Sequence, residues 1–254
     1  MPGQFFWHEL MTTDTKAAEK FYGDVVGWKA TDSGVGGGSQ YTLFNVGDRG
    51  IAGMLAITPD MASHGARPGW LGYISVDDVD GALARLKQEG GKAFMGPQEV
   101  PNVIRFAMVA DPQGAPFYIA KGLMEAPPPL AMGMPGTVGW NELMASDWQA
   151  AFAFYSKMFG WTKETAHDMG PMGIYQLFAA GGPPIGGMMT KPPQVPVAHW
   201  GYYFNVDAID AGTERITKGG GKIVNGPIEV PGGQWVVQAV DPQGAHFNLV
   251  AAKR

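Results

Sequence analysis

The chain has 254 residues, of which 45% are hydrophobic and 16% charged, a balance typical of a globular protein with a substantial core. Its 18 basic and 23 acidic residues give a net charge of −5 without a run of Lys or Arg, so we expect no nucleic-acid partner. The absence of cysteine excludes disulfides, thiolate metal ligands and a cysteine nucleophile. The sequence shows neither a signal peptide nor an apolar stretch of the ~20 residues that cross a bilayer. We therefore expect a soluble, cytoplasmic protein with no membrane partner.

The first half of the chain predicts an alternation of strands and helices. Residues 5–11 are short and aromatic-rich, as in a strand, and Asp14 is a good N-cap for the helix that follows and ends at Gly27. Strands are predicted over 40–46, 50–57 and, after a polar loop, 70–76. A second helix begins after Asp77-Asp78 and ends at Gly90-Gly91. Strands over 92–95, 103–110 and 115–120 complete the segment.

The whole segment then recurs. Trp7-His8-Glu9-Leu10 returns as Trp140-Asn141-Glu142-Leu143, and Asp111-Pro112-Gln113-Gly114-Ala115 returns as Asp241 to Ala245. The offset between the two copies falls only from 133 to 130, so few insertions separate them. A repeat of this length and regularity indicates a duplicated domain.

A proline-rich stretch, which contains three consecutive prolines, separates the copies. Such a stretch cannot continue a helix or a central strand and is expected to be extended. The sequence therefore predicts a first domain over 1–121, a linker over 122–136 and a second domain over 137–254.

The motifs resemble those of a known superfamily. Asp14-x-x-x-Ala18, Phe21-Tyr22, Gly27-Trp28 and Asp-Pro-Gln-Gly, in this order and spacing, are similar to those of the vicinal oxygen chelate proteins (glyoxalases, bleomycin resistance proteins and extradiol dioxygenases). The resemblance extends over both copies and is nearest to a two-copy bacterial subgroup of glyoxalase- or hydroxylase-like proteins. It implies an α+β fold of four βαβββ units, in which curved mixed sheets form two tandem glyoxalase-like domains and enclose cavities.

The resemblance also implies where metal ligands would stand. The ligand positions of metal-using members correspond here to Trp7, Leu71, Tyr118 and Gly53 in the first copy, and to Trp140, Gly201, Asn248 and Gly187 in the second. Trp, Leu and Gly side chains offer no metal ligand, and the Tyr and Asn oxygens do not replace the set. We therefore expect no metal and no other cofactor.

One displaced alternative stays open. In the second copy His199, His246 and Glu142 lie two residues from ligand positions and thus on the same strand faces. Together they have the composition of a two-histidine, one-carboxylate site for a divalent metal such as Fe, Ni or Zn. The first copy has Glu9, Gly69 and Pro116 at these places. His8 alternates to the opposite face and is expected to be structural.

Aromatic and Met side chains with a few polar groups are predicted to line a ligand pocket in each copy. In the first copy these are Trp7, Tyr41, Met54, Trp70, Tyr73, Arg105 and Tyr118, and in the second Trp140, Tyr175, Met188, Trp200, Tyr202 and Asn248. Glu9, Glu142 and His246 are the candidate catalytic groups. A carboxylate on such a face is costly unless it is paired or used.

The sequence favours a protein that binds a small aromatic or amphipathic molecule without the usual metal site. A metal-dependent lyase, dioxygenase or hydroxylase that uses the displaced site is an alternative, and a non-catalytic interaction protein is another. Whether the chain is an enzyme stays open at this point, as does the choice between a monomer and a homodimer.

Overall fold

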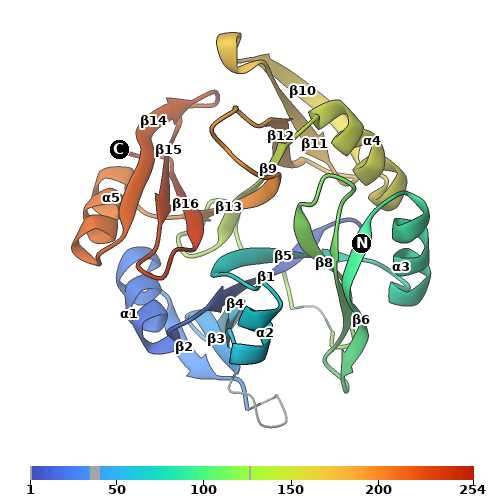
Figure 1. The fold of residues 1–254 in the computed structure, drawn as a ribbon. Helices are drawn as coiled ribbons and strands as arrows, with labels where there is room; N and C mark the ends of the chain where they lie inside the picture. The colour runs from blue at the N-terminus through green and yellow to red at the C-terminus, as the bar shows by residue number, and fades with distance from the viewer. Residues whose placement is uncertain (1, 35–40, 126) are drawn as a thin grey trace. The chain divides into compact units, whose positions relative to one another are not determined.

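A computed structural model describes residues 2–34, 41–125 and 127–254 of the chain (Figure 1). In the first copy the elements are β1 (Phe5–Thr12), α1 (Thr15–Val26), β2 (Lys29–Asp32), β3 (Tyr41–Val46), β4 (Arg49–Ala56), α2 (Pro59–Ser63), β5 (Gly69–Ser75), α3 (Val79–Gln88), β6 (Lys92–Val100), β7 (Ile104–Ala110) and β8 (Pro116–Gly122). The α+β class and the βαβββ order are both confirmed.

The second copy repeats this order. Its elements are β9 (Val138–Ala145), α4 (Trp148–Phe159), β10 (Thr162–Asp168), the 3-10 helix η1 (Gly170–Met172), β11 (Ile174–Ala179), β12 (Pro184–Thr190), β13 (His199–Asn205), α5 (Ile209–Lys218), β14 (Lys222–Val230), β15 (Gln234–Val240) and β16 (His246–Ala251). The described residues between β8 and β9 form neither helix nor strand. No helix among the described residues is long and apolar enough to cross a membrane.

Local sequence explains where the helices begin and end. The Asp14 side chain accepts a hydrogen bond from the Ala17 amide at the start of α1, and Gly27 ends the helix with φ at 88°. The expected polar loop before β5 instead contains α2. Thr58 caps this short helix by accepting from the Met61 amide, and Pro59 occupies a first-turn position where its missing N–H costs nothing.

The strands form two mixed sheets of eight, one from each copy. β1 pairs with β4 and β5 pairs with β8 in parallel, whereas β3 pairs with β4 and β7 pairs with β8 antiparallel. The second sheet repeats this pattern. Each copy thus contributes two four-stranded halves, in the orders β2-β3-β4-β1 and β5-β8-β7-β6 for the first copy.

The compact units of the chain do not coincide with the copies of the repeat. One unit, which we call unit 1, comprises residues 1–6, 71–128 and 140–201, and the other, unit 2, comprises 7–70, 129–139 and 202–254. Each unit therefore combines the first half of one copy with the second half of the other. In unit 2, α1 and α5 lie side by side (Figure 1). In unit 1, α3 contacts α4.

Each unit has an aromatic core beside its helices. In unit 1 the Trp161 ring stacks on Tyr155 and Phe178, with ring centroids 5.0 and 4.3 Å apart. The Trp161 indole donates to the Gly3 carbonyl at 2.7 Å. The equivalent Trp28 in unit 2 donates to the Gly136 carbonyl at the same distance. The Gly-Trp motif after the first helix of each copy is therefore a core anchor.

Candidate functional site

A hydrogen-bonded chain of three side chains lies on the first half-sheet of the second copy, within unit 1. The Trp140 indole N–H donates to the Tyr175 hydroxyl oxygen at 2.8 Å, and this hydroxyl donates to Oε1 of Glu142 at 3.0 Å. Trp140 and Glu142 stand two residues apart on β9 and so project from the same face of the sheet. Glu142 is 7% exposed, whereas the rings of Trp140 and Tyr175 are half-buried. A buried carboxylate is thus stabilised by a phenol that is itself held by an indole.

A glycine makes room for this arrangement. Gly187 pairs with Glu142 in the parallel ladder of β12 and β9, and a Cβ at Gly187 would overlap the ring of Tyr175. The glycine therefore lets the tyrosine lie flat across the strand and reach the carboxylate. Gly53 and Gly187 are equivalent positions of the repeat. The structure explains why both are glycine, since a Cβ at either position would overlap a tyrosine.

The first copy holds the same residues within unit 2. The Trp7 indole donates to the Tyr41 hydroxyl at 3.0 Å, and a Cβ at Gly53 would overlap that hydroxyl. Gly53 pairs with Glu9, which is 4% exposed. Each unit thus carries one fixed Trp–Tyr pair next to a buried glutamate. We call these the Trp7–Tyr41 pair and the Trp140–Tyr175 pair.

Four predicted pocket residues lie instead in the cores. The Trp70 indole donates to the Tyr22 hydroxyl and the Trp200 indole to the Tyr155 hydroxyl, both at 2.9 Å, on the helix side of the sheets. Met54 and Met188 are fully buried. Each follows a glycine that faces the Trp–Tyr pair, so strand alternation turns the methionine to the opposite side. None of these four side chains belongs to either Trp–Tyr pair.

The second half-sheets bring together three further predicted residues, Tyr73, Tyr118 and Asn248, and one residue that the sequence reasoning missed, Tyr203. In unit 1, Tyr73 and Tyr118 are opposite each other in the parallel ladder and stack with ring centroids 4.2 Å apart. In unit 2 the corresponding pair is Tyr203 and Asn248. Tyr203 was missed in favour of Tyr202, whose ring packs against the buried His8. The offset of 130 from Tyr73 identifies Tyr203 directly.

Arg105 is engaged at the surface. Its Nε and Nη2 atoms donate to the two carboxylate oxygens of Asp80, each at 2.9 Å, and Nη1 lies 3.6 Å from Glu99. This two-pronged contact turns the guanidinium toward α3. The structure therefore places Arg105 apart from Tyr73 and Tyr118, its predicted partners.

Neither of the two predicted metal sites offers a suitable set of donor atoms. The positions that hold ligands in metal-using relatives carry indole, aliphatic, phenol and amide groups or no side chain here. Within the described part of the chain, no three His, Cys, Asp or Glu side chains gather as a metal site would require. The displaced set is thus not assembled: the His199 ring lies 3.1 Å from the Val197 carbonyl, and His246 is exposed. The residues at these positions do not fit a metal ion.

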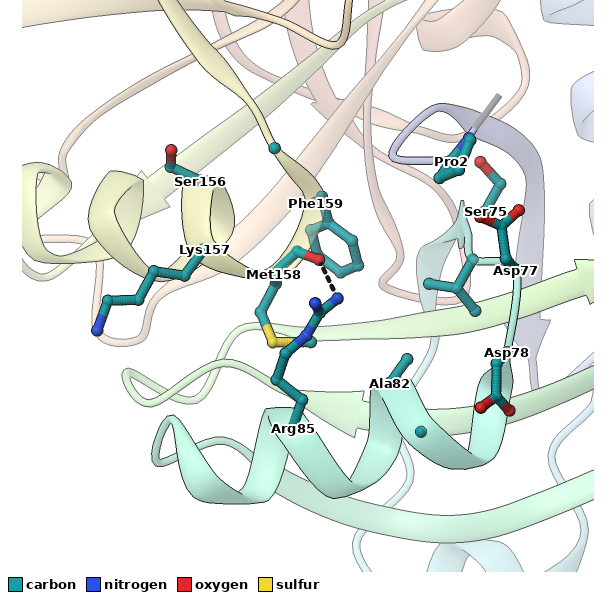
Figure 2. A pocket seen from close by; sticks show the side chains of 13 residues that line it. Pro2, Ser75, Asp77, Asp78, Ala82, Arg85, Ser156, Lys157, Met158 and Phe159 are labelled. Atoms are coloured by element: carbon teal, nitrogen blue, oxygen red, sulfur yellow. Dashed lines mark hydrogen bonds between the residues drawn. The ribbon is translucent and has the colours of Figure 1, made fainter.

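Unit 1 also has a surface groove of about 540 Å³ between α3 and α4 (Figure 2). Figure 2 shows Arg85 of α3 reaching the Met158 carbonyl at the end of α4, a hydrogen bond of 2.6 Å. Lys157, on the same rim, pairs with Glu89 at 2.9 Å. The cations of this groove are thus used to join the two helices, and neither Trp–Tyr pair lines it.

Comparison with known proteins matches both copies of the repeat to the same family. The model of the Glyoxalase/Bleomycin resistance protein/Dioxygenase superfamily matches residues 4–119 and again 137–249. The chain is 34% identical over 250 residues to "Putative glyoxylase CFP32" of Mycobacterium tuberculosis, spanning 96% of this chain and 93% of that protein. It is 32% identical to "Anthracycline biosynthesis protein DnrV" of Streptomyces peucetius, over 98% of this chain and 93% of the relative.

Two solved structures share the fold. The Mn(II)-bound glyoxalase of Novosphingobium aromaticivorans has a TM-score of 0.69 at 17% identity, over 100% of this chain and 83% of the other. Homoprotocatechuate 2,3-dioxygenase of Arthrobacter globiformis has a TM-score of 0.68 at 14% identity, over 98% and 80% of the two chains. At these identities the similarity concerns the fold alone.

Proposed function

Because the chain belongs to the glyoxalase/bleomycin resistance protein/dioxygenase superfamily, we propose that it uses this fold to bind a small aromatic or amphipathic molecule without a metal. The observation that carries the proposal is the Trp–Tyr pair of each copy, built beside a buried glutamate. The ligand contacts the half-buried indole and phenol rings. In each copy one of the positions that would hold a metal in relatives is occupied by the tryptophan of the pair.

The geometry of the pairs suits the stacking of a planar ligand. The indole N–H of Trp140 is satisfied by Tyr175, so the ring keeps its orientation without a partner from solvent. A ring that is already fixed loses little conformational freedom on binding, and this lowers the cost of association. Aromatic walls with a few placed polar groups are the usual lining of small-molecule sites. Offset or edge contacts between rings contribute about 0.5–1.5 kcal/mol each beyond simple burial.

The relatives favour one class of ligand. DnrV and DauV, both 32% identical to this chain, are named anthracycline biosynthesis proteins. Anthracyclines carry a planar, fused ring system with hydroxyl and keto groups. A fused aromatic ring with polar substituents also matches the Trp–Tyr pair and its adjoining carboxylate. We therefore place the ligand in this class.

A proton-transfer enzyme is the second candidate. A buried carboxylate is a suitable general base, and Glu142 is held at a fixed place by the Tyr175 hydroxyl. In this reading Glu142, and Glu9 in the first copy, would remove a proton from the bound molecule. Chemical conversion of a bound ligand, lost in Glu142→Gln and Glu9→Gln, distinguishes this function from binding alone.

A titration with anthraquinone-2-sulfonate, a soluble planar probe, tests the proposal by calorimetry in the presence of EDTA. We expect the double variant Trp7→Leu/Trp140→Leu to bind at least about tenfold more weakly, the equivalent of 1.4 kcal/mol. Trp148→Leu and Trp235→Leu are matched controls, because these half-buried indoles face Lys163 and Arg254 elsewhere on the surface. Unchanged binding by the double variant, or binding that requires an added divalent metal, would overturn the proposal.

A further inference from the structure

The two copies differ on the inner strands of their second half-sheets. We define the Tyr73 face as Tyr73, Phe106, Met108 and Tyr118 in unit 1, and the Tyr203 face as Tyr203, Val236, Gln238 and Asn248 in unit 2. The offset of 130 relates each residue of one face to one of the other. The ladders agree, since Met108 pairs with Tyr118 and Gln238 pairs with Asn248. Only the first tyrosine is the same in both faces.

The Tyr73 face is an aromatic platform. The Tyr73 and Tyr118 rings are nearly parallel, 16° apart, and Phe106 meets Tyr118 edge-on with centroids 5.8 Å apart. Phe6, which is 41% exposed, forms a T-shaped contact with Tyr73, with ring centroids 6.3 Å apart. The two tyrosines are themselves buried, whereas Phe106 and Met108 are half-buried. The face thus presents accessible apolar rings on a rigid, stacked base.

The Tyr203 face is a network of amides. The Gln238 side-chain amide donates to the Tyr203 hydroxyl at 3.2 Å, and Asn225 donates to the Gln238 carbonyl oxygen at 3.4 Å. Asn248 stands where Tyr118 stacks in the other copy. The flanking positions are also less apolar in the second copy. Gly139 stands at the position of Phe6, and His246 at the position of Pro116. His246 is exposed beside this network.

We propose that the two faces accept different ligand chemistry: the Tyr73 face takes a planar apolar ring, and the Tyr203 face takes a group rich in hydroxyls. The inference rests on the proposed binding function and names the specificity of each copy. A ring placed over amides would cover donors and acceptors that it cannot satisfy, which weakens its binding. A hydroxylated group would satisfy them. Over the stacked tyrosines a planar ring is favoured instead, because these side chains offer ring contacts but few hydrogen bonds to a hydroxylated group.

Reciprocal exchange of the two faces tests the inference, with anthraquinone-2-sulfonate as the probe. The wild-type chain is expected to bind one equivalent. Phe106→Val/Met108→Gln/Tyr118→Asn is expected to lose this binding, and Val236→Phe/Gln238→Met/Asn248→Tyr to bind a second equivalent. Every introduced residue already occupies the equivalent position of the same fold. The single variants Met108→Gln and Gln238→Met serve if a triple variant does not fold, with the same directions expected.

The polar face has its own probe. Saturation-transfer NMR with methyl α-D-glucopyranoside is expected to show contact with the wild-type chain. The variant with the exchanged Tyr73 face should keep this contact, and the variant with the exchanged Tyr203 face should lose it. Two equal anthraquinone sites in the wild type, or glucoside contact that ignores both exchanges, would overturn the inference and leave the proposed function standing. A wild-type chain that binds no anthraquinone would overturn both.

Discussion

The hydroxyl of Tyr155 donates a hydrogen bond to Oδ2 of Asp111 at 3.1 Å, and so joins the first helix of the second copy to a turn of the first copy. Oδ1 of the same carboxylate accepts from the amides of Gln113 and Ala115, which holds the Asp-Pro-Gln-Gly turn closed. In unit 2, Tyr22 donates to Asp241 at 3.0 Å in the same way. The Phe-Tyr and Asp-Pro-Gln-Gly motifs are therefore partners from opposite copies.

Removal of the hydroxyl tests this link. Tyr155→Phe leaves the Trp200 indole and one oxygen of Asp111 without their partner inside the core. We expect a loss of roughly 1–3 kcal/mol in the free energy of unfolding, the cost of an unsatisfied buried polar group. Urea denaturation measures it, and Tyr22→Phe provides an independent second instance in unit 2. A loss below about 0.5 kcal/mol in both variants, the range of ordinary surface substitutions, would contradict the role.

The buried aspartates predict a specific dependence of stability on pH. Burial raises the pKa of Asp241, and of Asp111, above the ordinary carboxyl value of 3.8. A raised native pKa means that the native state holds the proton more tightly than the unfolded chain. The stability from this group is therefore complete below pH 3.8 and declines as the pH rises through the native pKa.

Asp241→Asn isolates this effect because the amide does not titrate. The asparagine keeps the oxygen that accepts from Gln243 and Ala245 but loses the acceptor for Tyr22. The advantage of the wild type over the variant in unfolding free energy should thus be largest at low pH and shrink toward neutrality. Urea titrations at a series of pH values between 3.5 and 7 measure it. An advantage that grows with pH would show that the carboxylate, not the carboxylic acid, is favoured in the core.

Much of the fold was predictable because short-range rules determine it. Asp14 and Gly27 bound the first helix as expected, since a side-chain cap and a left-handed glycine act within a few residues. The combination of half-copies into units was not predictable. A repeat shows that two segments share a fold, but the pairing of Tyr155 with Asp111 depends on contacts between residues that are distant in sequence.

The candidate site was predicted in part. The Trp-x-Glu spacing correctly indicated that Trp140 and Glu142 share a face, because alternation along one strand is reliable over two residues. Trp70 was assigned to the same face as Tyr73, although three residues separate them and alternation puts them on opposite sides. The Tyr22 hydroxyl, which the Trp70 indole needs as a partner, decides this orientation and comes from another element.

The placement of Arg105 predicts that it is dispensable for ligand binding. Its guanidinium is held by Asp80 at the surface, and exposed ion pairs contribute only about 0–1 kcal/mol. Arg105→Gln should therefore bind anthraquinone-2-sulfonate like the wild type, with a small change in melting temperature. Asp80→Asn, which breaks the same pair from the other side, is the matched control. A loss of binding in Arg105→Gln but not in Asp80→Asn would return the arginine to the site.

Gly187 provides the most direct test of how the fold builds the Trp140–Tyr175 pair. Its backbone is compatible with alanine, so Gly187→Ala acts only through the Cβ, which overlaps the Tyr175 ring. The ring must then leave Glu142, at the cost of about 1–3 kcal/mol that overpacking usually brings. We expect a lower melting temperature and a change in fluorescence as the Trp140 indole loses its acceptor.

Gly182→Ala is the matched control, because a Cβ there meets nothing within 4 Å. If both variants behave alike, the glycine does not position the tyrosine. If Gly187→Ala alone changes the indole signal while the chain remains folded, the Trp–Tyr–Glu arrangement depends on the one position where the strand has no side chain.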